Sequence, residues 1–448
     1  MMSNYVADRA IVIGAGMAGL AAAGALSKHF EHVLVLDRDP IPGEPAHRPG
    51  TPQARHAHVL LAGGLCALGE LFPGFADSLT EAGAVPIEFN RDFRIERAPF
   101  DPFPRREFGI TMLASTRPHL EFVTRRRLAE RPNVALRRNC RVQAFVASPD
   151  GARIIGVRCE TEGVTETLDA DLVIDASGRG NLTRDCLLAN GYDAPEETAI
   201  GMDAGYSTTV FNLPGGPPEF LGVNHFASAP ESGRGAVMLP CEGNRWIVSL
   251  LGMHGDKPPA EWADCLAYAR SFRTPTVYDV LRDAEPVGDI HRYALPASTR
   301  RHFERLKRFP GGLLPLGDSV CRFNPIFGQG MSVGALEAVT LHELLSERGR
   351  EHNVLDALAP AWFAAASDVI QTPWSVAILD LMYPETTGVR PPDLEDSLAF
   401  TAALFRLAAR DPEVHRLFTE VQQLLKPNSV FQDPEFAERV NAEIAEPR

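Results

Sequence analysis

A strand, a tight turn and a helix near the start of the chain constrain its fold more than any other feature. The segment AIVIGAGMAGLAAAGAL begins with four apolar residues and continues with Gly14, Gly16 and Gly19 in G-x-G-x-x-G spacing. Gly14 permits the turn, Gly16 lets the backbone approach a pyrophosphate at the helix N-terminus, and Gly19 lets the helix lie close to the strand. The next apolar run, HVLVLDRD, ends at Asp37, whose carboxylate can accept hydrogen bonds from an adenosine ribose. The pattern predicts dinucleotide binding.

The segment from residue 134 onward distinguishes two kinds of dinucleotide-binding protein. A nicotinamide-dependent dehydrogenase continues with alternating strands and helices, whereas VALRRNCRVQAFVASPDGARIIGVRCETEGVTETLDADLVIDASGRG predicts three successive strands with turns at SPDG and TEG. The third strand, residues 171–176, is apolar enough to join the first sheet. With this meander the chain resembles the flavoprotein monooxygenases built like glutathione reductase and para-hydroxybenzoate hydroxylase. The resemblance implies that the dinucleotide is FAD.

A second motif, around residue 318, is similar to the other FAD signature of that family. PLGDSVCRFNPIFGQGMSVGALEA begins as a buried strand, reaches Asp318, and continues as a proline and glycine loop before a helix of small residues. The resemblance implies that Asp318 binds the ribityl chain; capping a helix or closing a turn is the other role for such an acid. N–H groups at the helix start can stabilise negative charge on a reduced flavin. The contacts expected here are Asp318, Pro325, Gly328, Gly330, Met331 and Ser332.

Four further positions are expected at the cofactor. Ala18 lies in the first glycine motif, and Arg38 follows the acid that ends the second strand. STRPHLEFVTRRRLAE resembles the helix from which the family's arginine reaches FAD, at the position of Arg117, and its later arginines are expected on a solvated face. Arg55 lies in ARHAHVL, a stretch that in that family runs beside the isoalloxazine ring.

His56 and His58, in the same stretch, are interpreted as packed side chains or as neighbours of the flavin. Residues two apart on a helix do not share a face, and no carboxylate or cysteine lies at ligand spacing from the pair. No metal site is therefore expected.

One branch of the family is similar over a long stretch of the chain. RPGTPQARHAHVLLAGGLCALGELFPGFADSLTEAGA, DLVIDASGRGN and GDSVCRFNPIFGQGMS resemble flavin epoxidases of polyether biosynthesis, of the lasalocid and monensin type, and the similarity covers roughly residues 8–340. Phenol hydroxylases of this fold carry an Asp-Gly pair where this chain has Ser177 and Gly178, so its handling of nicotinamide differs from theirs. Flavin halogenases carry W-x-W-x-I-P and a catalytic lysine, and nothing near Trp246 matches, which disfavours halogenation.

The expected fold class is α/β, with a Rossmann-like FAD-binding domain that carries a β-meander, a β-sheet substrate domain and a helical C-terminal region. The expected boundaries are 1–90, 110–200 and 300–345 for the FAD-binding domain, 91–109 and 201–299 for the substrate domain, and 346–448 for the helices. Four apolar strand residues are candidates for a substrate wall, although such residues also form sheet cores. They are Phe211, Met238, Leu239 and Trp246.

Composition excludes several other classes of protein. The 44 basic and 58 acidic residues give a net charge of −14, which argues against a nucleic-acid partner. The seven cysteines are scattered without a C-x-x-C motif, which favours a reducing cytoplasm. The N-terminal segment lacks the features of a signal peptide, and no apolar run reaches bilayer length, so no membrane span is expected.

The resemblance implies a monooxygenase, in which reduced flavin adds dioxygen at C4a and the hydroperoxide gives one oxygen atom to an electron-rich carbon. An alkene needs no activating base, and no obvious histidine or tyrosine pair is present, so the residues favour epoxidation of an apolar polyketide, terpenoid or indolic intermediate. Hydroxylation of an aromatic or indolic compound stays open, as does a flavin-binding protein without catalysis. Electrons are expected from NADPH or NADH, directly or through a flavin reductase. No catalytic residue is assigned.

Overall fold

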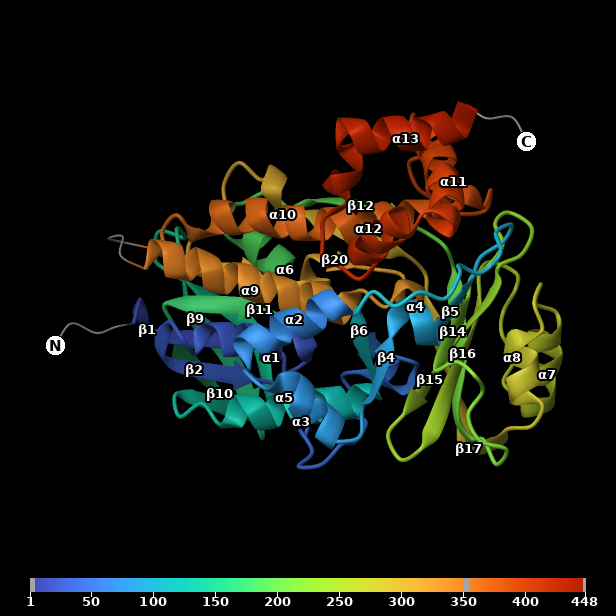
Figure 1. Ribbon diagram of the computed structural model, residues 1–448. Helices are drawn as coiled ribbons and strands as arrows, with labels where there is room; N and C mark the ends of the chain where they lie inside the picture. Colours follow the sequence, from blue (N-terminus) through green and yellow to red (C-terminus); the bar gives the residue numbers. More distant parts are fainter. Residues whose placement is uncertain (1–4, 350–353, 446–448) are drawn as a thin grey trace.

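The computed structural model describes residues 5–349 and 354–445, and its first sheet is built from five parallel strands. Because both faces of this sheet are covered, its central strands are continuous apolar runs. Helices α1, α5 and α9 lie on one face, and an antiparallel meander of three strands lies on the other (Figure 1). The sheet order is β19 (Leu313–Pro315), β11 (Leu172–Asp175), β1 (Ala7–Ile13), β2 (Phe30–Leu36) and β7 (Val134–Arg137). The helices are α1 (Met17–Leu26), α5 (Arg117–Ala129) and α9 (Gly330–Arg348).

The meander contains a strand that the sequence does not predict. Its strands are β8 (Cys140–Ala147), β9 (Ile154–Thr161) and β10 (Val164–Asp169), and the predicted third strand, residues 171–176, is β11 in the first sheet, so β10 is the additional strand. Burial alternates along β10, which pairs with β9, whereas all four residues of β11 are buried beside β1. The chain passes from the meander to the parallel sheet at Asp171, whose Oδ2 accepts a hydrogen bond from the N–H of Arg9 at 2.8 Å.

A six-stranded sheet forms the second part of the molecule, and helices α7 and α8 cover its outer face (Figure 1). Strand β5, from the short segment before residue 110, joins this sheet parallel to β14. The sheet order is β17 (Glu285–Leu295), β13 (Ala204–Asn212), β16 (Arg245–Gly252), β15 (Arg234–Cys241), β14 (Gly222–His225) and β5 (Phe93–Glu96); the helices are α7 (Trp262–Arg270) and α8 (Thr276–Leu281).

Two small sheets and four short helices connect these parts. One sheet contains β12 (Glu196–Ile200), β18 (Ser298–His302) and β20 (Cys321–Arg322), and the other β3 (Val59–Leu60), β6 (Thr111–Ala114) and β4 (Val85–Glu88). The helices are α2 (Ala62–Leu71), α3 (Phe75–Glu81), α4 (Phe89–Asp92) and α6 (Leu182–Ala189).

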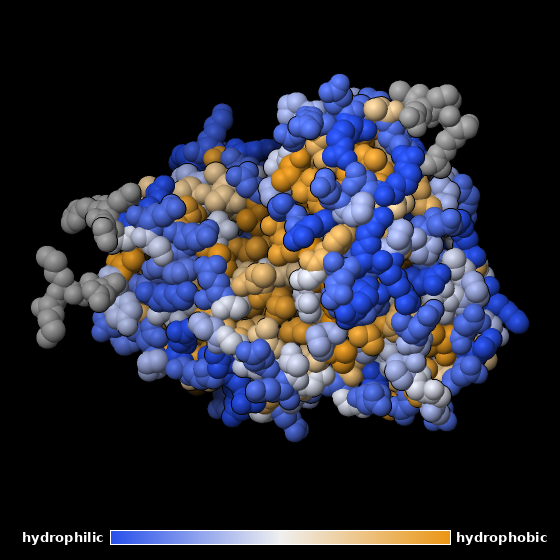
Figure 2. Space-filling model, viewed as in Figure 1, coloured by the Kyte–Doolittle hydropathy of each residue, from blue (hydrophilic) through white to orange (hydrophobic). Residues whose placement is uncertain are grey.

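Hydrogen bonds near the C-terminal ends of α11 and α12 connect these helices to the rest of the molecule, whereas α10 packs along α9 in the main core. The first N–H groups of α2 donate to the backbone and side-chain oxygens of Gln423, which satisfies donors that a helix start leaves free. Arg106 donates to the carbonyls of Ala408 and Ala409 near the end of α11. Figure 2 shows apolar side chains gathered between α9 and these helices, on a face that is otherwise mostly polar. The helices are α10 (Leu358–Ala377), α11 (Leu394–Arg410), α12 (Pro412–Gln422) and α13 (Pro434–Ala445).

The expected α/β class is confirmed, with its parallel sheet, its further sheets and its C-terminal helices. Within the described residues no helix is both long and apolar enough to cross a bilayer. The first four residues of the N-terminal segment lie outside the described residues.

Candidate active site

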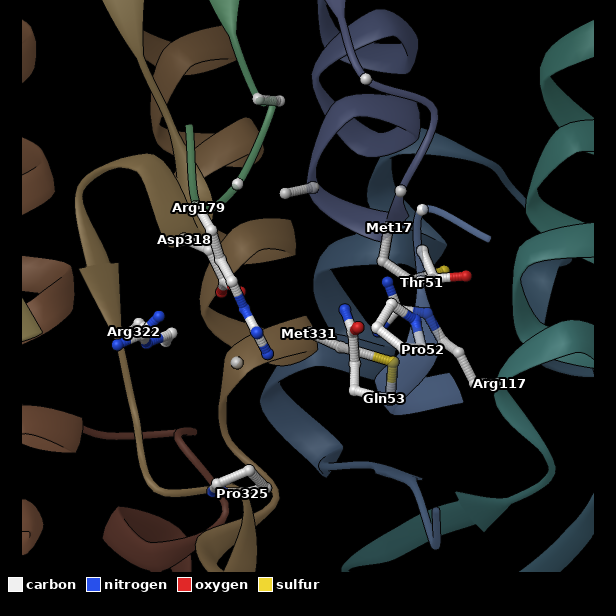
Figure 3. Close-up of a pocket in the computed structure, with 18 of the residues that line it drawn as sticks. Met17, Thr51, Pro52, Gln53, Arg117, Arg179, Asp318, Arg322, Pro325 and Met331 are labelled. Atoms are coloured by element: carbon white, nitrogen blue, oxygen red, sulfur yellow. The ribbon is translucent and has the colours of Figure 1, made fainter. Parts of the chain in front are cut away.

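A cavity of about 670 Å³ lies where the first sheet faces the six-stranded sheet. The carboxyl ends of β1, β2 and β11 reach it, which is the edge at which open parallel sheets bind nucleotides. Its volume lies in the range of cofactor and ligand sites. Figure 3 shows Arg179 and Asp318 on one side of this cavity and Met17, Gln53 and Arg117 on the other.

The glycine turn leaves open space at the start of α1. A Cβ on Gly14, where φ is +102°, would lie 2.5 Å from the Ala176 oxygen, and one on Gly19 would lie 1.9 Å from the Gly14 oxygen. Gly14 and Ala18 line the cavity, whereas Gly19 acts through close packing behind it. A Cβ on Gly16 would meet only guanidinium nitrogens, at 3.7 and 3.9 Å. The space beside Gly16 is therefore free for an anion at the helix N-terminus.

Arg48 is a residue that the sequence analysis missed. Its guanidinium donates to Asp37 Oδ2 at 3.1 Å, Asp39 Oδ2 at 2.9 Å and Glu121 Oε2 at 3.0 Å. Asp37 also accepts from the N–H of Ala15 at 2.6 Å, so its carboxylate is fixed at the cavity wall. Burial acts to lower the pKa of Arg48, but Glu121 and Asp37 outweigh it and raise that pKa, which keeps the cation charged.

Arg117 lines the cavity and is held by the same cluster. Its Nε donates to Glu121 Oε1 at 2.8 Å, and one of its terminal nitrogens is the atom that a Cβ on Gly16 would meet at 3.7 Å. Two guanidinium groups thus border the space at the start of α1, as a pyrophosphate requires. Glu121 was not among the predicted site residues, although its position four residues after Arg117 on one helix indicates an ion pair between them.

Residues of the second motif also line the cavity. They are Asp318, Pro325, Gly328, Gly330 and Met331, and exposed Arg38, which follows β2, lines it as well. Burial by the surrounding protein raises the pKa of the Asp318 carboxyl although its side chain opens onto the cavity, and nearby guanidinium groups act in the opposite direction.

Two expected cofactor contacts lie away from the cavity surface. Ser332 is buried, and its Oγ accepts from the N–H of Leu61 at 3.1 Å. Arg55 is exposed, because the turn at Pro52–Arg55 directs its side chain outward, and it makes a 3.2 Å contact with His291. His56 and His58, from the same stretch, line the cavity. Both histidines lie outside an α-helix, and no group of three or more potential metal ligands occurs in the described part of the chain.

The four residues expected to form an apolar substrate wall do not line the cavity. Phe211, Met238 and Trp246 pack against α7 and α8, and Leu239 packs beside Ile87. Successive strand residues face opposite sides, so the register of each strand decides which of them meets the cavity. The sheet residues that line it are Tyr206, Val237, Ser249, Tyr293 and Leu295.

Three aromatic rings meet at this sheet wall. The ring of His56 lies 6.0 Å from that of Tyr206 and 5.3 Å from that of Tyr293. The guanidinium of Arg179 lies over the Tyr293 ring at 5.1 Å. The sequence analysis found no such histidine and tyrosine group, because its members come from three distant segments and carry no shared motif.

Comparisons with known proteins agree with this arrangement. Residues 10–189 match the model of the family described as FAD dependent oxidoreductase. Protein Rv3254 of Mycobacterium tuberculosis (strain ATCC 25618 / H37Rv) is 35% identical over an alignment of 356 residues, which covers 76% of this chain and 73% of the relative.

Solved structures show the same fold at low identity. Flavin-dependent brominase Bmp2 superposes with a TM-score of 0.69 at 14% identity, covering 98% of each chain. PqsL, a probable FAD-dependent monooxygenase from Pseudomonas aeruginosa, gives 0.61 at 16% identity, covering 88% of this chain and 99% of its own. The p-nitrophenol 4-monooxygenase PnpA from Pseudomonas putida DLL-E4 gives 0.63 at 19%, covering 94% and 99%. The chain belongs to the FAD-dependent oxidoreductases and has the fold of the flavin monooxygenases.

Proposed function

We propose that the protein is an FAD-dependent monooxygenase that transfers one oxygen atom of dioxygen to a carbon–carbon double bond of an apolar natural-product intermediate, giving an epoxide. The observation that carries this proposal is the charge distribution around the cavity. Among the described residues that line it, the only carboxylates are Asp37 and Asp318, at the two nucleotide motifs, and none is a lysine. An alkene needs neither a carboxylate base nor an ammonium group to react.

The residues around the cavity fit FAD. Gly16, Arg48 and Arg117 would hold the pyrophosphate, Asp37 the adenosine ribose, and Asp318 the ribityl chain. A bound and reduced FAD supplies the electrons with which dioxygen is activated. The chain's own contribution is to exclude water and orient the substrate, through the apolar side chains of the sheet wall.

Halogenation is not supported, although the fold is shared with a brominase. The lysines of the chain are Lys28, Lys257, Lys307 and Lys426, and none of them lines the cavity. The catalytic lysine expected of a flavin halogenase therefore has no counterpart at this site.

A second candidate is hydroxylation of an aromatic or indolic compound, which is favoured by the histidine and tyrosine group at the sheet wall. Burial lowers the pKa of His56, and the neighbouring His58 lowers it further, to about 3, so His56 is a weak base. Since a phenol requires a base matched to its own proton, the epoxidase is the better supported of the two.

The source of electrons is proposed to be NADPH or NADH, acting directly or through a separate flavin reductase. Ser177 replaces the acid that couples flavin to nicotinamide in the hydroxylases, and its hydroxyl donates to buried Asp175 at 2.6 Å. Asp175 is enclosed by this loop and cannot take the place of the missing acid, which favours slow direct reduction.

Labelled dioxygen supplied with a panel of prenyl, polyene, phenol and indole substrates tests the proposal. Label in an epoxide, or in the diol or ether formed from it, is the expected result. Label only on an arene ring favours the second candidate, and product oxygen derived from water contradicts monooxygenation. A flavin-binding protein without catalysis would consume dioxygen without forming any oxygenated product.

A further inference from the structure

Three side chains at the sheet wall form a continuous chain of hydrogen bonds. His56 Nδ1 lies 2.7 Å from Thr208 Oγ1, and Thr208 Oγ1 lies 2.6 Å from Ser249 Oγ. Ser249 Oγ also accepts from the N–H of Ala57 at 2.9 Å. The chain thus joins the turn after Pro52–Arg55 to neighbouring strands β13 and β16.

The two ends of this chain meet the same cavity, while its middle does not. His56 and Ser249 both line the cavity, and Thr208 lies behind the wall with 1% of its surface exposed. Within the described residues, His56 Nε2 has no hydrogen-bond partner. His56 Nε2 and Ser249 Oγ are therefore the two atoms through which the chain can exchange protons with the cavity contents.

The chain allows only two proton arrangements. In the first, Ser249 donates to Thr208, Thr208 donates to His56 Nδ1, and the imidazole proton is on Nε2. In the second, His56 Nδ1 donates to Thr208, Thr208 donates to Ser249, and the Ser249 proton turns to the cavity. Conversion of the second into the first takes up one proton at Nε2 and releases one at Ser249.

We propose that His56, Thr208 and Ser249 are a proton relay that takes up one proton at His56 Nε2 and delivers one from Ser249 Oγ to the cavity in which dioxygen is reduced. This role rests on the proposed oxygen chemistry. Monooxygenation of one dioxygen molecule takes two electrons from the reductant and two protons, and it leaves one oxygen atom in the product and one in water. The relay supplies one of these protons and moves no electrons. The proton comes from solvent through water at the His56 end, because an alkene gives up no proton when it is epoxidised.

A relay suits a histidine that stays neutral. Burial and the neighbouring His58 hold the pKa of His56 near 3, so an imidazolium that stores the proton is unfavourable at neutral pH. When Nε2 gains a proton as Nδ1 gives one up, the ring carries no net charge before or after the transfer. The same burial that makes His56 a weak base is thus compatible with proton transfer through it.

Thr208→Val interrupts the relay without changing a residue that lines the cavity. The matched control is Thr209→Val, because Thr209 is the next residue on β13, is 4% exposed, and donates only to the Val210 carbonyl at 3.2 Å. The measurement is the rate at which photoreduced, FAD-loaded protein is reoxidised by dioxygen, without substrate, in mixtures of H2O and D2O. This reaction takes two electrons and two protons to hydrogen peroxide.

In wild type and in Thr209→Val, the rate of flavin reoxidation should depend non-linearly on the mole fraction of D2O, because several protons move in the same step. In Thr208→Val the rate should be at least about tenfold lower and should depend linearly on the mole fraction of D2O. Thr208→Ser keeps a hydroxyl and should restore the non-linear dependence. Equal rates and equal curves in wild type and Thr208→Val overturn the relay, as does equal behaviour of Thr208→Val and Thr208→Ser. If Thr208→Val fails to fold or to bind FAD, Ser249→Ala takes its place with the same two outcomes.

A second readout does not depend on turnover. In apo-protein labelled with 15N-histidine, the His56 signal is assigned by its loss in His56→Gln. The relay predicts a neutral ring between pH 5.5 and 8 whose tautomer balance changes in Thr208→Val and not in Thr209→Val. An unchanged His56 spectrum in Thr208→Val contradicts the relay even if labelled oxygen reaches the product, whereas a confirmed relay without labelled product contradicts only the proposed function.

Discussion

Replacement of Arg48 by methionine tests the charge balance beside the cavity. The guanidinium contacts Asp37, Asp39 and Glu121 at 3.1, 2.9 and 3.0 Å, and the Arg48 side chain is 4% exposed. Removal of one partner from a buried ion pair costs about 3–5 kcal/mol, because the remaining charge stays buried without compensation. We therefore expect Arg48→Met to lower the free energy of unfolding by about 3–5 kcal/mol at pH 7.

The loss of unfolding free energy in Arg48→Met should become smaller at acidic pH, as the pKa of Glu121 indicates. Burial acts to raise the pKa of Glu121, but Arg117 and Arg48 outweigh it and hold that pKa below 4.5. A carboxylate whose pKa is lowered in the folded state stabilises the fold above its unfolded pKa, and this stabilisation is lost as pH falls through the folded value. The difference between wild type and Arg48→Met should be largest above about pH 5 and smaller toward about pH 3.

Urea denaturation of the apo-protein at pH 7 and at pH 4 measures both effects. The control is Arg126→Met, on the exposed face of α5, which should change the free energy of unfolding by less than about 0.5 kcal/mol. A loss below about 1 kcal/mol for Arg48→Met at pH 7, or a loss that does not change with pH, would refute the reasoning.

Four further outcomes follow from the same contacts. Gly16→Val fills the open space at the start of α1, and Asp318→Ala removes the carboxylate at the other motif, so equilibrium dialysis should show weaker FAD retention in both; undiminished retention contradicts the assignment. Burial raises the pKa of Glu337 to about 8, and its Oε2 accepts from the Gly317 N–H at 2.7 Å. An acid whose folded pKa is raised costs stability as pH rises from its unfolded value toward the folded one, so Glu337→Gln should gain stability relative to wild type between pH 5.5 and 8 in urea denaturation, and a constant difference would count against this. Anaerobic stopped-flow mixing with NADPH or NADH should bleach the flavin band slowly, and fast reduction without substrate contradicts the interpretation of Ser177.

The nucleotide motifs could be read from the sequence because their chemistry is local. The positive φ of Gly14 and the contact of Gly19 with the Gly14 oxygen belong to one turn, so the spacing of the glycines is sufficient to predict them, whereas the approach of Gly14 to the Ala176 oxygen depends on a distant strand. Strand β10 was not predicted, because VTETLD contains few apolar residues and none of its side chains is fully buried, whereas the continuous apolar run of β11 was predicted as the strand at residues 171–176.

The sheet wall could not be predicted in the same way. A strand's alternation separates two faces, but it does not say which face meets the cavity and which meets a helix, so Phe211, Met238 and Trp246 were assigned to the wrong side. The packing of helices α7 and α8 on the outer face determines which side chains of each strand are turned away from the cavity.

Long-range polar contacts were also decided by the tertiary structure alone. Arg48 has no motif of its own, and its position follows from the need of three buried carboxylates for one cation. His56, Thr208 and Ser249 are separated by up to 193 residues in the chain, yet two hydrogen bonds of 2.7 and 2.6 Å join them. The sequence by itself predicted a dinucleotide-binding motif, since short-range steric rules specify it, and the resemblance of the meander and of the second motif indicated FAD. Which side chains line the rest of the cavity was determined only when distant strands and loops packed together and their polar atoms became one another's hydrogen-bond partners.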